Sequence, residues 1–466
     1  MFEISQIWTI KSRNEILSLL IFCILLLIAS FFGSFLLALG LCIAIFLGII
    51  IKKAEVIFLI WLTFSPILIS DSFSLFKLGK HPLLTFDRII IGGLFLFILI
   101  QSILKIKPLL PVNKFEVLFI ILLIIILISV ISKSENKLQG ARVLTDGFLY
   151  PFFIYLIAKN LIKDDKYFYN FVNAFLFISV YLSSMGIFEY FTKIDLLPTK
   201  VGLPIRSGWL RANGPYINDV AFAINLSICF FIVLYKFRVE HIKNKRSMSK
   251  IILYGSILCL IFFAIILTFL RAVWLQTMIA LLLWGFLRKK RKIILILILS
   301  LILLIIMPLI SNIISSYVFQ ERIANIGTIE SRFMIYDYAL FLFKKNPFFG
   351  IGFENFYYIT KHKNFPPYTH NTYLSFLTET GIIGFLVIMI IIFLILQLAY
   401  KYYKKSEHML DKNFSIAFIC VFVCFLMPWL SQESGYFHEI NKLFFPILGV
   451  VVSRYRRLHL KNTIIG

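Results

Sequence analysis

Residues 311–384 read SNIISSYVFQERIANIGTIESRFMIYDYALFLFKKNPFFGIGFENFYYITKHKNFPPYTHNTYLSFLTETGIIG. This stretch is the long polar passage of a chain that otherwise consists mostly of apolar runs. It contains a block with helical character at 331–345, turns at Pro347 and at 350–352, and His370 just before the next apolar run. Loops on a rigid scaffold often carry binding and catalytic side chains. We therefore expect a functional site here, on the outer face of a membrane.

The composition indicates an integral membrane protein. Of the 466 residues, 60% are hydrophobic and 15% are charged, whereas a soluble domain is about 45–50% apolar and about 25% charged. The apolar runs are about 20 residues long, which suits a hydrocarbon core roughly 30 Å thick, and they do not alternate as barrel strands do. The expected fold class is all-α: a polytopic integral membrane protein with about 12–14 transmembrane helices and one large extracytoplasmic loop containing short helices.

The formal net charge of +24 is best explained by membrane topology. In a soluble protein it would suggest nucleic-acid binding, but here Lys and Arg cluster in short loops beside apolar runs, above all at 236–250 and 288–292. Such clusters mark cytoplasmic loops and contact anionic headgroups. We expect membrane lipids and no nucleic acid as partners. The six cysteines lie inside apolar runs, so we interpret them as packing residues and expect no metal and no cofactor.

The positive-inside rule orients the chain. It places the densest basic loops and both termini in the cytoplasm. The loop at 192–216, the turn at Arg271 and the large polar loop then face outward. We expect about 14 spans, or about 12 if the short sixth run (148–162) and the last run (443–452) are re-entrant or interfacial.

Two domains are expected. Residues 1–191 are predicted to form an N-terminal transmembrane bundle. Residues 192–466 are predicted to form a C-terminal transmembrane domain that includes the large outer loop, 311–376. Because the first 190 residues carry little beyond hydropathy, we expect the chemistry in the second domain.

This topology brings three basic groups, Arg211, Arg271 and His370, to one face of the membrane. Arg211 and His370 each precede an inward-running helix, and Arg271 stands at the boundary between two helices. Helix N-termini and arginine side chains both favour phosphate groups. A histidine can take a proton from a hydroxyl near neutral pH. Together these groups suit a pyrophosphate beside a hydroxyl nucleophile.

Structural roles are the alternative for each residue taken alone. An arginine at a helix boundary is often a snorkelling anchor, and a histidine near the membrane surface is often structural. Gly350 and Gly352 permit a turn. The tyrosines of the outer loop form either an interfacial belt or a sugar-stacking surface. The conjunction of the three basic groups, and no single residue, favours a site.

Four passages in the C-terminal half carry recognisable motifs. They are Arg211-Ala212-Asn213-Gly214 with Asn218; Ser331-Arg332 with Tyr336; the run at 346–352 with Asn355-Phe356; and His370-Asn371-Thr372-Tyr373-Leu374 with Leu377, Glu379, Gly381 and Gly384.

Together these passages resemble the O-antigen ligase and polymerase family of polysaccharide glycosyltransferases. Two positions depart from the family pattern. Leu270 stands where the family usually has a serine before Arg271, and Tyr336 replaces the usual tryptophan. The similarity covers about half of the chain, and the histidine-asparagine passage is its most specific part.

The resemblance implies an inverting, metal-independent glycosyltransferase. Its donor would be a glycan on undecaprenyl pyrophosphate, and its acceptor a sugar hydroxyl on lipid A core or on another lipid-linked glycan. By analogy Arg211 and Arg271 would hold the leaving pyrophosphate, and His370 would orient or deprotonate the acceptor, with Glu379 as an acidic competitor for that role. The remaining predicted substrate-binding residues are Arg206, Arg332, Asn371 and Tyr373.

The expected location is the bacterial cytoplasmic (inner) membrane, with the active site on its periplasmic side. O-antigen ligase and repeat-unit polymerase remain alternatives within this class. Outside it, a solute or ion transporter would usually carry ionisable groups or broken helices near the bilayer midplane. The spans are nearly free of such charges, which favours an enzyme. A glycan-binding scaffold without chemistry is the third alternative.

Overall fold

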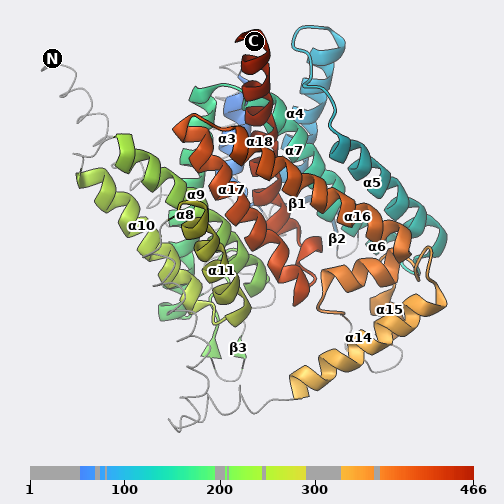
Figure 1. The fold of residues 1–466 in the computed structure, drawn as a ribbon. Coiled ribbons are helices and arrows are strands. Elements are labelled where there is room, and N and C mark those ends of the chain that lie inside the picture. The colour runs from blue at the N-terminus through green and yellow to red at the C-terminus, as the bar shows by residue number, and fades with distance from the viewer. Residues whose placement is uncertain are drawn as a thin grey trace, which may run out of the picture. The chain divides into compact units, whose positions relative to one another are not determined.

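The described part of the chain is helical apart from two short strand pairs (Figure 1). This confirms the predicted all-α class of polytopic membrane protein. The computed structural model describes residues 53–68, 74–78, 81–194, 205–206, 209–243, 248–289, 327–361 and 368–465.

Eight helical segments of the described residues are long and apolar enough to cross a membrane. The predicted count of about 12–14 includes runs that lie outside the described residues. The eight segments are Phe86–Ile103, Lys114–Lys133, Lys137–Leu161, Asp165–Thr192, Asp219–Ile242, Met248–Leu267, Thr372–Lys405 and Met409–Leu430.

The two runs for which a re-entrant or interfacial position was the alternative both belong to longer helical segments. The sixth run lies in Lys137–Leu161, which reaches spanning length because α6 (Lys137–Leu144), the π-helical turn η2 (Thr145–Leu149) and α7 (Tyr150–Leu161) follow one another without a break. The last run lies in α18 (His438–Ile465), a helix of 28 residues. Each helix is longer than its apolar run because polar residues extend the helix.

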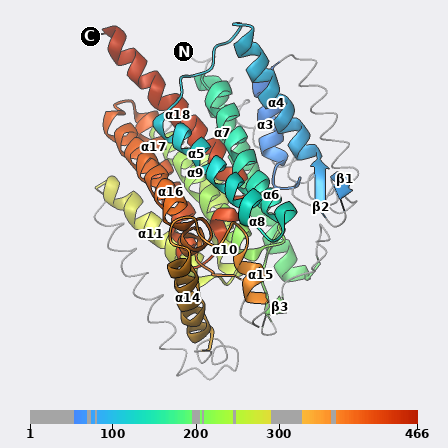
Figure 2. The same cartoon turned by 90° about the vertical axis from the view of Figure 1, so that its right-hand side faces the viewer.

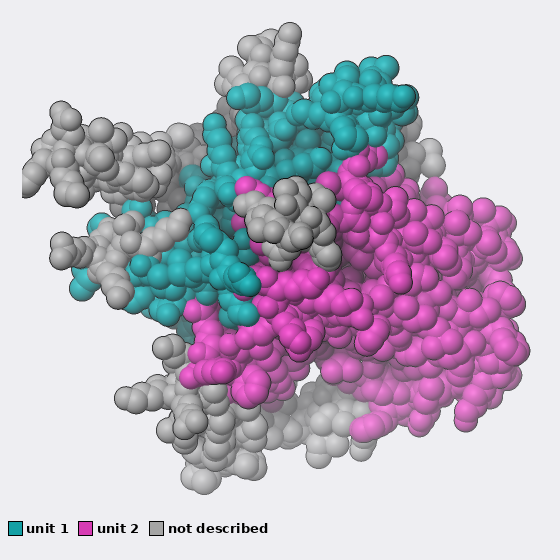
Figure 3. Space-filling model, turned by 45° about the horizontal axis from the view of Figure 1, so that its top comes forward, with its two compact units in different colours: residues 1–108, 157–270, 407–417 teal, residues 109–156, 271–406, 418–466 magenta. Residues whose placement is uncertain are grey.

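The chain divides into two compact units that interleave along the sequence (Figure 3). Unit 1 comprises residues 1–108, 157–270 and 407–417, and unit 2 comprises residues 109–156, 271–406 and 418–466. The predicted domain division after residue 191 stays a prediction.

Unit 1 is built around α9 (Asp219–Lys243), which packs against α8 (Asp165–Thr192) and α10 (Met248–Leu267). In the most apolar window of α9, 89% of the residues are buried. A helix with little polar surface suits such an interior position. Unit 1 also contains α3 (Ala54–Phe64), which packs on α8, and α4 (Phe86–Ile103).

Both strand pairs lie in unit 1 and were not predicted. One is an antiparallel hairpin of β1 (Ser74–Leu78) and β2 (His81–Thr85). The other joins β3 (Ile205–Arg206) to β4 (Trp209–Leu210). The strands β1 and β2 have five residues each but do not alternate strictly between apolar and polar residues, and β3 and β4, with two residues each, are too short to show a pattern.

Unit 2 is built around α16 (Thr372–Lys405), with α5 (Lys114–Lys133) packed along it (Figures 1 and 2). The N-terminus of α5 carries a capping box, in which the backbone N–H of Asn113 donates to Glu116 Oε2 at 2.9 Å. Such a cap satisfies N–H groups that the helix leaves open.

The outer loop contributes α14 (Gly327–Lys345) and α15 (Phe356–Lys361) to unit 2. This confirms the helical block predicted at 331–345 and the short helices of the loop. Figure 1 shows α14 lying across the end of α16. Its buried face, formed by Ile335, Ala339 and Leu342, packs with Phe356 of α15.

Candidate functional site

The turn at 346–352 fills a kink in α16. Gly381 has non-helical dihedrals (φ 69°, ψ −171°), so the backbone groups around it lack helical partners. The turn supplies them: the Ile382 N–H donates to the Pro347 carbonyl at 2.8 Å, and the Ile351 N–H donates to the Thr378 carbonyl at 3.0 Å. The glycine-rich turn and the glycine-containing start of α16, two separate sequence motifs, are therefore one structural element.

Asn355 ties this element to the end of α5. Its Nδ2 donates to the carbonyls of Lys133 at 2.8 Å and Ile351 at 2.9 Å, and its Oδ1 accepts the Glu135 N–H at 2.8 Å. Lys133 Nζ donates to the Gly350 carbonyl at 2.8 Å. The outer loop therefore depends on a helix from the part of the chain in which the sequence showed only hydropathy.

His370 lies between two residues with fixed structural roles. Asn371 is the N-cap of α16, and its Oδ1 accepts the Leu374 N–H at 3.1 Å. Thr369 is buried, whereas His370 is partly exposed. The backbone of His370 is left-handed, with φ 51°, a conformation uncommon outside glycine that is often found at functional sites. Asn371 thus shapes the helix start; its predicted contact with substrate stays a prediction.

Glu433, in the connection between α17 (Met409–Leu426) and α18, binds this segment. Its Oε1 accepts the Thr369 N–H at 2.7 Å, the Thr369 hydroxyl at 2.8 Å and the Ser375 hydroxyl at 2.9 Å. Sequence analysis missed this residue. In the sequence it is recognisable only as an acidic residue in the polar stretch between two spans, and its neighbours in the sequence do not identify its partner in α16.

Glu354, Glu379 and Glu433 form an acidic cluster beside Tyr436. Glu379 is buried; its Oε1 accepts the Phe356 N–H at 3.3 Å and its Oε2 accepts the Tyr436 hydroxyl at 3.5 Å. The sequence placed Glu379 at the site and gave no indication of the other two carboxylates as its neighbours.

Burial raises the pKa of the two carboxyl groups of the cluster that lie outside the membrane-spanning segments, Glu354 and Glu433. Burial, reinforced by the charge of Glu433, raises the pKa of Glu354 to about 8. Burial also raises the pKa of Glu433, although hydrogen bonds from Thr369 and Ser375 oppose the shift. The pKa of the Tyr436 hydroxyl lies well above its usual range because of burial and the nearby carboxylates, Glu379 foremost. Carboxyl groups in such an environment can exchange protons near physiological pH.

Arg271 and Arg332 are the predicted phosphate ligands in unit 2. Arg271 is exposed at the first position of α11 (Arg271–Leu287), and Arg332 is partly exposed in α14. Neither has an ion-pair partner within the described ranges. Within the described part of the chain, both guanidinium groups are therefore available to bind an anion.

α11 and α16 run in the same direction through unit 2. Tyr403 Oη, near the end of α16, donates to the carbonyl of Leu287 at the end of α11, at 3.2 Å. The 3-10 turn η3 (Met427–Leu430) contacts both helices, and its Trp429 packs on Tyr373 in the first turn of α16. The N-termini of the two helices, with Arg271 and His370, therefore point to the same side of unit 2.

Tyr373 packs between helices. Besides its ring contact with Trp429, at 5.5 Å between centroids, its hydroxyl donates to the Leu426 carbonyl at 3.4 Å. Its predicted role in substrate binding stays a prediction. Arg206 lies in β3, where it pairs with Trp209.

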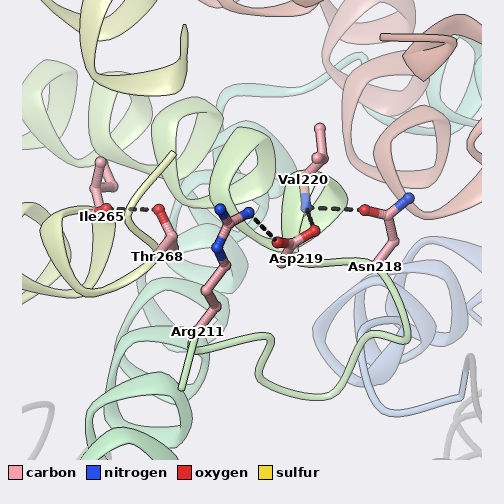
Figure 4. Close-up of polar contacts among 6 residues, drawn as sticks. All are labelled: Arg211, Asn218, Asp219, Val220, Ile265 and Thr268. Carbon is pink, nitrogen blue, oxygen red and sulfur yellow. Dashed lines mark hydrogen bonds and ion pairs between the residues drawn. The ribbon is translucent and has the colours of Figure 1, made fainter. Parts of the chain in front are cut away.

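Arg211 belongs to unit 1 and forms an ion pair with Asp219 (Figure 4). Its Nη1 lies 3.0 Å from Asp219 Oδ2, and both side chains are largely buried. Figure 4 shows the guanidinium group directed toward Asp219, with Thr268 on its other side. The buried Nε of Arg211 has no hydrogen-bond partner in the described structure. One edge of the guanidinium group is thus held by a carboxylate, which sets its orientation.

The fold and these residues define a helical membrane protein with cationic groups and a histidine at helix N-termini. Residues 255–389 match the family model described as O-Antigen ligase. The match supports assignment of the chain to the O-antigen ligase family, which confirms the resemblance inferred from the sequence. A search of curated proteins found no match.

The matched residues include Arg271, Arg332, His370 and Glu379; Arg211 and Glu433 lie outside them. The assignment supports a glycosyltransferase-like function of the ligase or polymerase type, with lipid-linked glycans as substrates.

Proposed function

We propose that the protein transfers a glycan from undecaprenyl pyrophosphate to an acceptor sugar hydroxyl at the outer face of the bacterial cytoplasmic membrane. One observation carries the proposal. The residues that match the O-antigen ligase family contain both Arg271 and His370, and the helices that follow these two residues run in the same direction through unit 2.

The arginines suit the leaving group. When the acceptor oxygen bonds to the anomeric carbon, the bond from that carbon to the pyrophosphate oxygen breaks, and undecaprenyl pyrophosphate leaves with the electron pair. Arg271, exposed at a helix N-terminus, and Arg211 supply fixed positive charge for the developing negative charge. Asp219 holds Arg211 in one orientation, so little reorganisation is needed when the donor binds. Arg332 is a further ligand of the same group.

His370 suits the acceptor. It takes the proton of the attacking hydroxyl, so that attack on the face opposite the pyrophosphate inverts the anomeric centre. Glu379 competes less well for this role because it is buried and already accepts bonds from Phe356 and Tyr436. Lipid A core is the acceptor in the ligase form of the proposal, and a second lipid-linked glycan is the acceptor in the polymerase form.

The placement of buried charge favours an enzyme over a transporter. Glu116 lies in the first turn of α5, Lys159 in the last turn of α7 and Glu189 in the last turn of α8. Transporters place ionisable groups and broken helices near the bilayer midplane. In these three helices the buried charges lie at the ends, and the buried Glu379, beside the kink at Gly381, lies about two turns from the start of the 34-residue helix α16.

Arg271→Ala and His370→Ala test the proposal in cells that lack the chromosomal gene. We expect both variants to insert at normal levels and to give no polysaccharide transfer, and lipid-linked glycan to accumulate. Lys289→Ala, exposed at the opposite end of α11, is the control and should restore transfer. Full transfer by both test variants would overturn the proposal.

The glycan that accumulates in the deletion cells separates the two forms of the reaction. Long chains left on undecaprenyl pyrophosphate indicate a ligase. Single repeat units on the final acceptor indicate a polymerase.

A further inference from the structure

We infer that Glu433 is a positioning residue, which holds His370 in its working conformation by binding the residues on either side of it. The inference rests on the role proposed for His370. It concerns a residue outside the family match, on the connection between two later helices.

The contacts of Glu433 are directed at the segment that carries His370. All three of its hydrogen bonds go to one oxygen, Oε1, from the backbone and hydroxyl of Thr369 and from the hydroxyl of Ser375. The distances, 2.7–2.9 Å, are those of well-formed hydrogen bonds. A single carboxylate oxygen thus joins the residue before His370 to the first turns of α16.

Thr369 extends this hold to the other side of His370. Its hydroxyl oxygen accepts the Asn371 N–H at 3.2 Å and lies 2.6 Å from Ser375 Oγ. The backbone is therefore fixed immediately before and immediately after His370. A left-handed backbone at a non-glycine residue persists only where its surroundings determine it, and Glu433 supplies that constraint.

The environment of Glu433 makes these bonds hard to replace with water. The titratable groups that face it are Glu354, Glu379, Tyr368 and Tyr436, and a negative charge on Glu433 raises the pKa of Glu354 and of the two tyrosines. The hydroxyl and N–H donors of Thr369 and Ser375 oppose the rise that burial causes in the pKa of Glu433. The side chain of Glu433 is therefore held by the same contacts that fix the backbone around His370.

The surrounding fold does not depend on Glu433 alone. Thr372 Oγ1 donates to the Gln432 carbonyl at 2.9 Å, and the Gly435 N–H donates to Thr372 Oγ1 at 3.2 Å. These bonds hold the connection on α16 when the carboxylate is removed. A Glu433→Ala variant should consequently insert and fold while its histidine segment is released.

Initial rates in membranes separate positioning from stability. The donor is lipid-linked glycan extracted from cells that lack the gene. At equal amounts of folded protein, we expect Glu433→Ala to lower kcat about 100-fold and to change the KM for donor by less than about threefold. Glu433→Gln keeps an acceptor oxygen at the same place, so its kcat should fall by no more than about tenfold. Thr369→Val keeps the carboxylate but removes the hydroxyl, and should lower kcat about tenfold with donor KM unchanged.

Gln432→Ala is the matched control, because the Gln432 side chain makes no hydrogen bond among the described residues and its carbonyl contact is kept. It should retain wild-type kcat. Wild-type kcat in Glu433→Ala would overturn the inference. An equal loss of kcat in Glu433→Ala and Glu433→Gln would also overturn it, because the carboxylate itself would then take part in the reaction. Full activity of His370→Ala would instead overturn the proposed function.

Discussion

Gly350 and Gly381 meet backbone to backbone. A Cβ atom on Gly350 would lie 2.6 Å from the Gly381 nitrogen, and one on Gly381 would lie 2.6 Å from the Gly350 nitrogen. Both residues also have positive φ, 63° and 69°. The turn of the outer loop therefore fits into the kink of α16 only because both positions lack a side chain.

Gly381→Ala is expected to prevent the outer loop from docking. The backbone of Gly381, at φ 69° and ψ −171°, lies in a region that is essentially restricted to glycine and costs another residue about 1–3 kcal/mol. The added methyl group would lie 2.3 Å from the Phe348 carbonyl oxygen, a backbone atom that cannot rotate away. We expect little folded protein by fluorescence-detected size-exclusion chromatography. Gly255→Ala, in α10 with nothing within 4 Å of the added atom, is the control and should behave as wild type. Normal folding of Gly381→Ala would contradict the proposed packing.

Asn355→Asp should destabilise the protein by several kcal/mol. Nδ2 of Asn355 donates to two carbonyls, and a carboxylate in its place would face both of them with unpaired charge. The thermal midpoint of the purified protein measures the effect. Asn346→Asp is the comparison, because Asn346 is exposed and its side chain makes no hydrogen bond among the described residues. Equal midpoints for the two variants would show that Asn355 does not anchor the loop.

Asp219→Asn is expected to raise the KM for the lipid-linked donor more than it lowers kcat. Without the carboxylate, Arg211 keeps its charge but loses the partner that orients it. Asn218→Ala tests the adjacent helix cap by itself, because Asn218 Oδ1 accepts the Val220 N–H at 2.9 Å without touching Arg211. An unchanged donor KM in Asp219→Asn would separate Arg211 from donor binding.

Local patterns predicted the helices well and their partners poorly. The helical block at 331–345 and the turn after it follow from periodicity and from Pro347, and both are present. Asn371 is a good N-cap by residue type alone. By contrast, the docking of the turn into α16 depends on a kink at Gly381 that hydropathy does not register, because the apolar pattern continues through it.

The candidate site shows the same limit. Arg211, Arg271 and His370 were recognisable as residue types at helix boundaries. The three bonds from Thr369 and Ser375 to Glu433 were not, because they join segments about 60 residues apart in the chain. No local signal encodes such a pair, and only the packing of the connection before α18 against α16 creates it.

Glu354→Gln should become more stable relative to the wild type as the pH rises from 5 to 9. In the unfolded chain Glu354 loses its proton near its ordinary pKa of 4.5, whereas in the folded protein it keeps that proton up to about pH 8. Between these values the folded state binds more protons than the unfolded state, so wild-type stability falls with rising pH. The contribution is fully present below pH 4.5 and is lost as the pH passes about 8. Glutamine is neutral throughout and shows no such loss.

Thermal midpoints of the two purified proteins at pH 5 and pH 9 measure this difference. Glu407→Gln, at an exposed carboxylate, corrects for the loss of one negative charge. The difference in midpoint between Glu354→Gln and the wild type should be small at pH 5 and should favour the variant at pH 9. Because the charge of Glu433 contributes to the raised pKa, the advantage of the variant should shrink in a Glu433→Gln background. A pH-independent difference would mean that Glu354 is solvated and that its pKa is not raised in the folded protein.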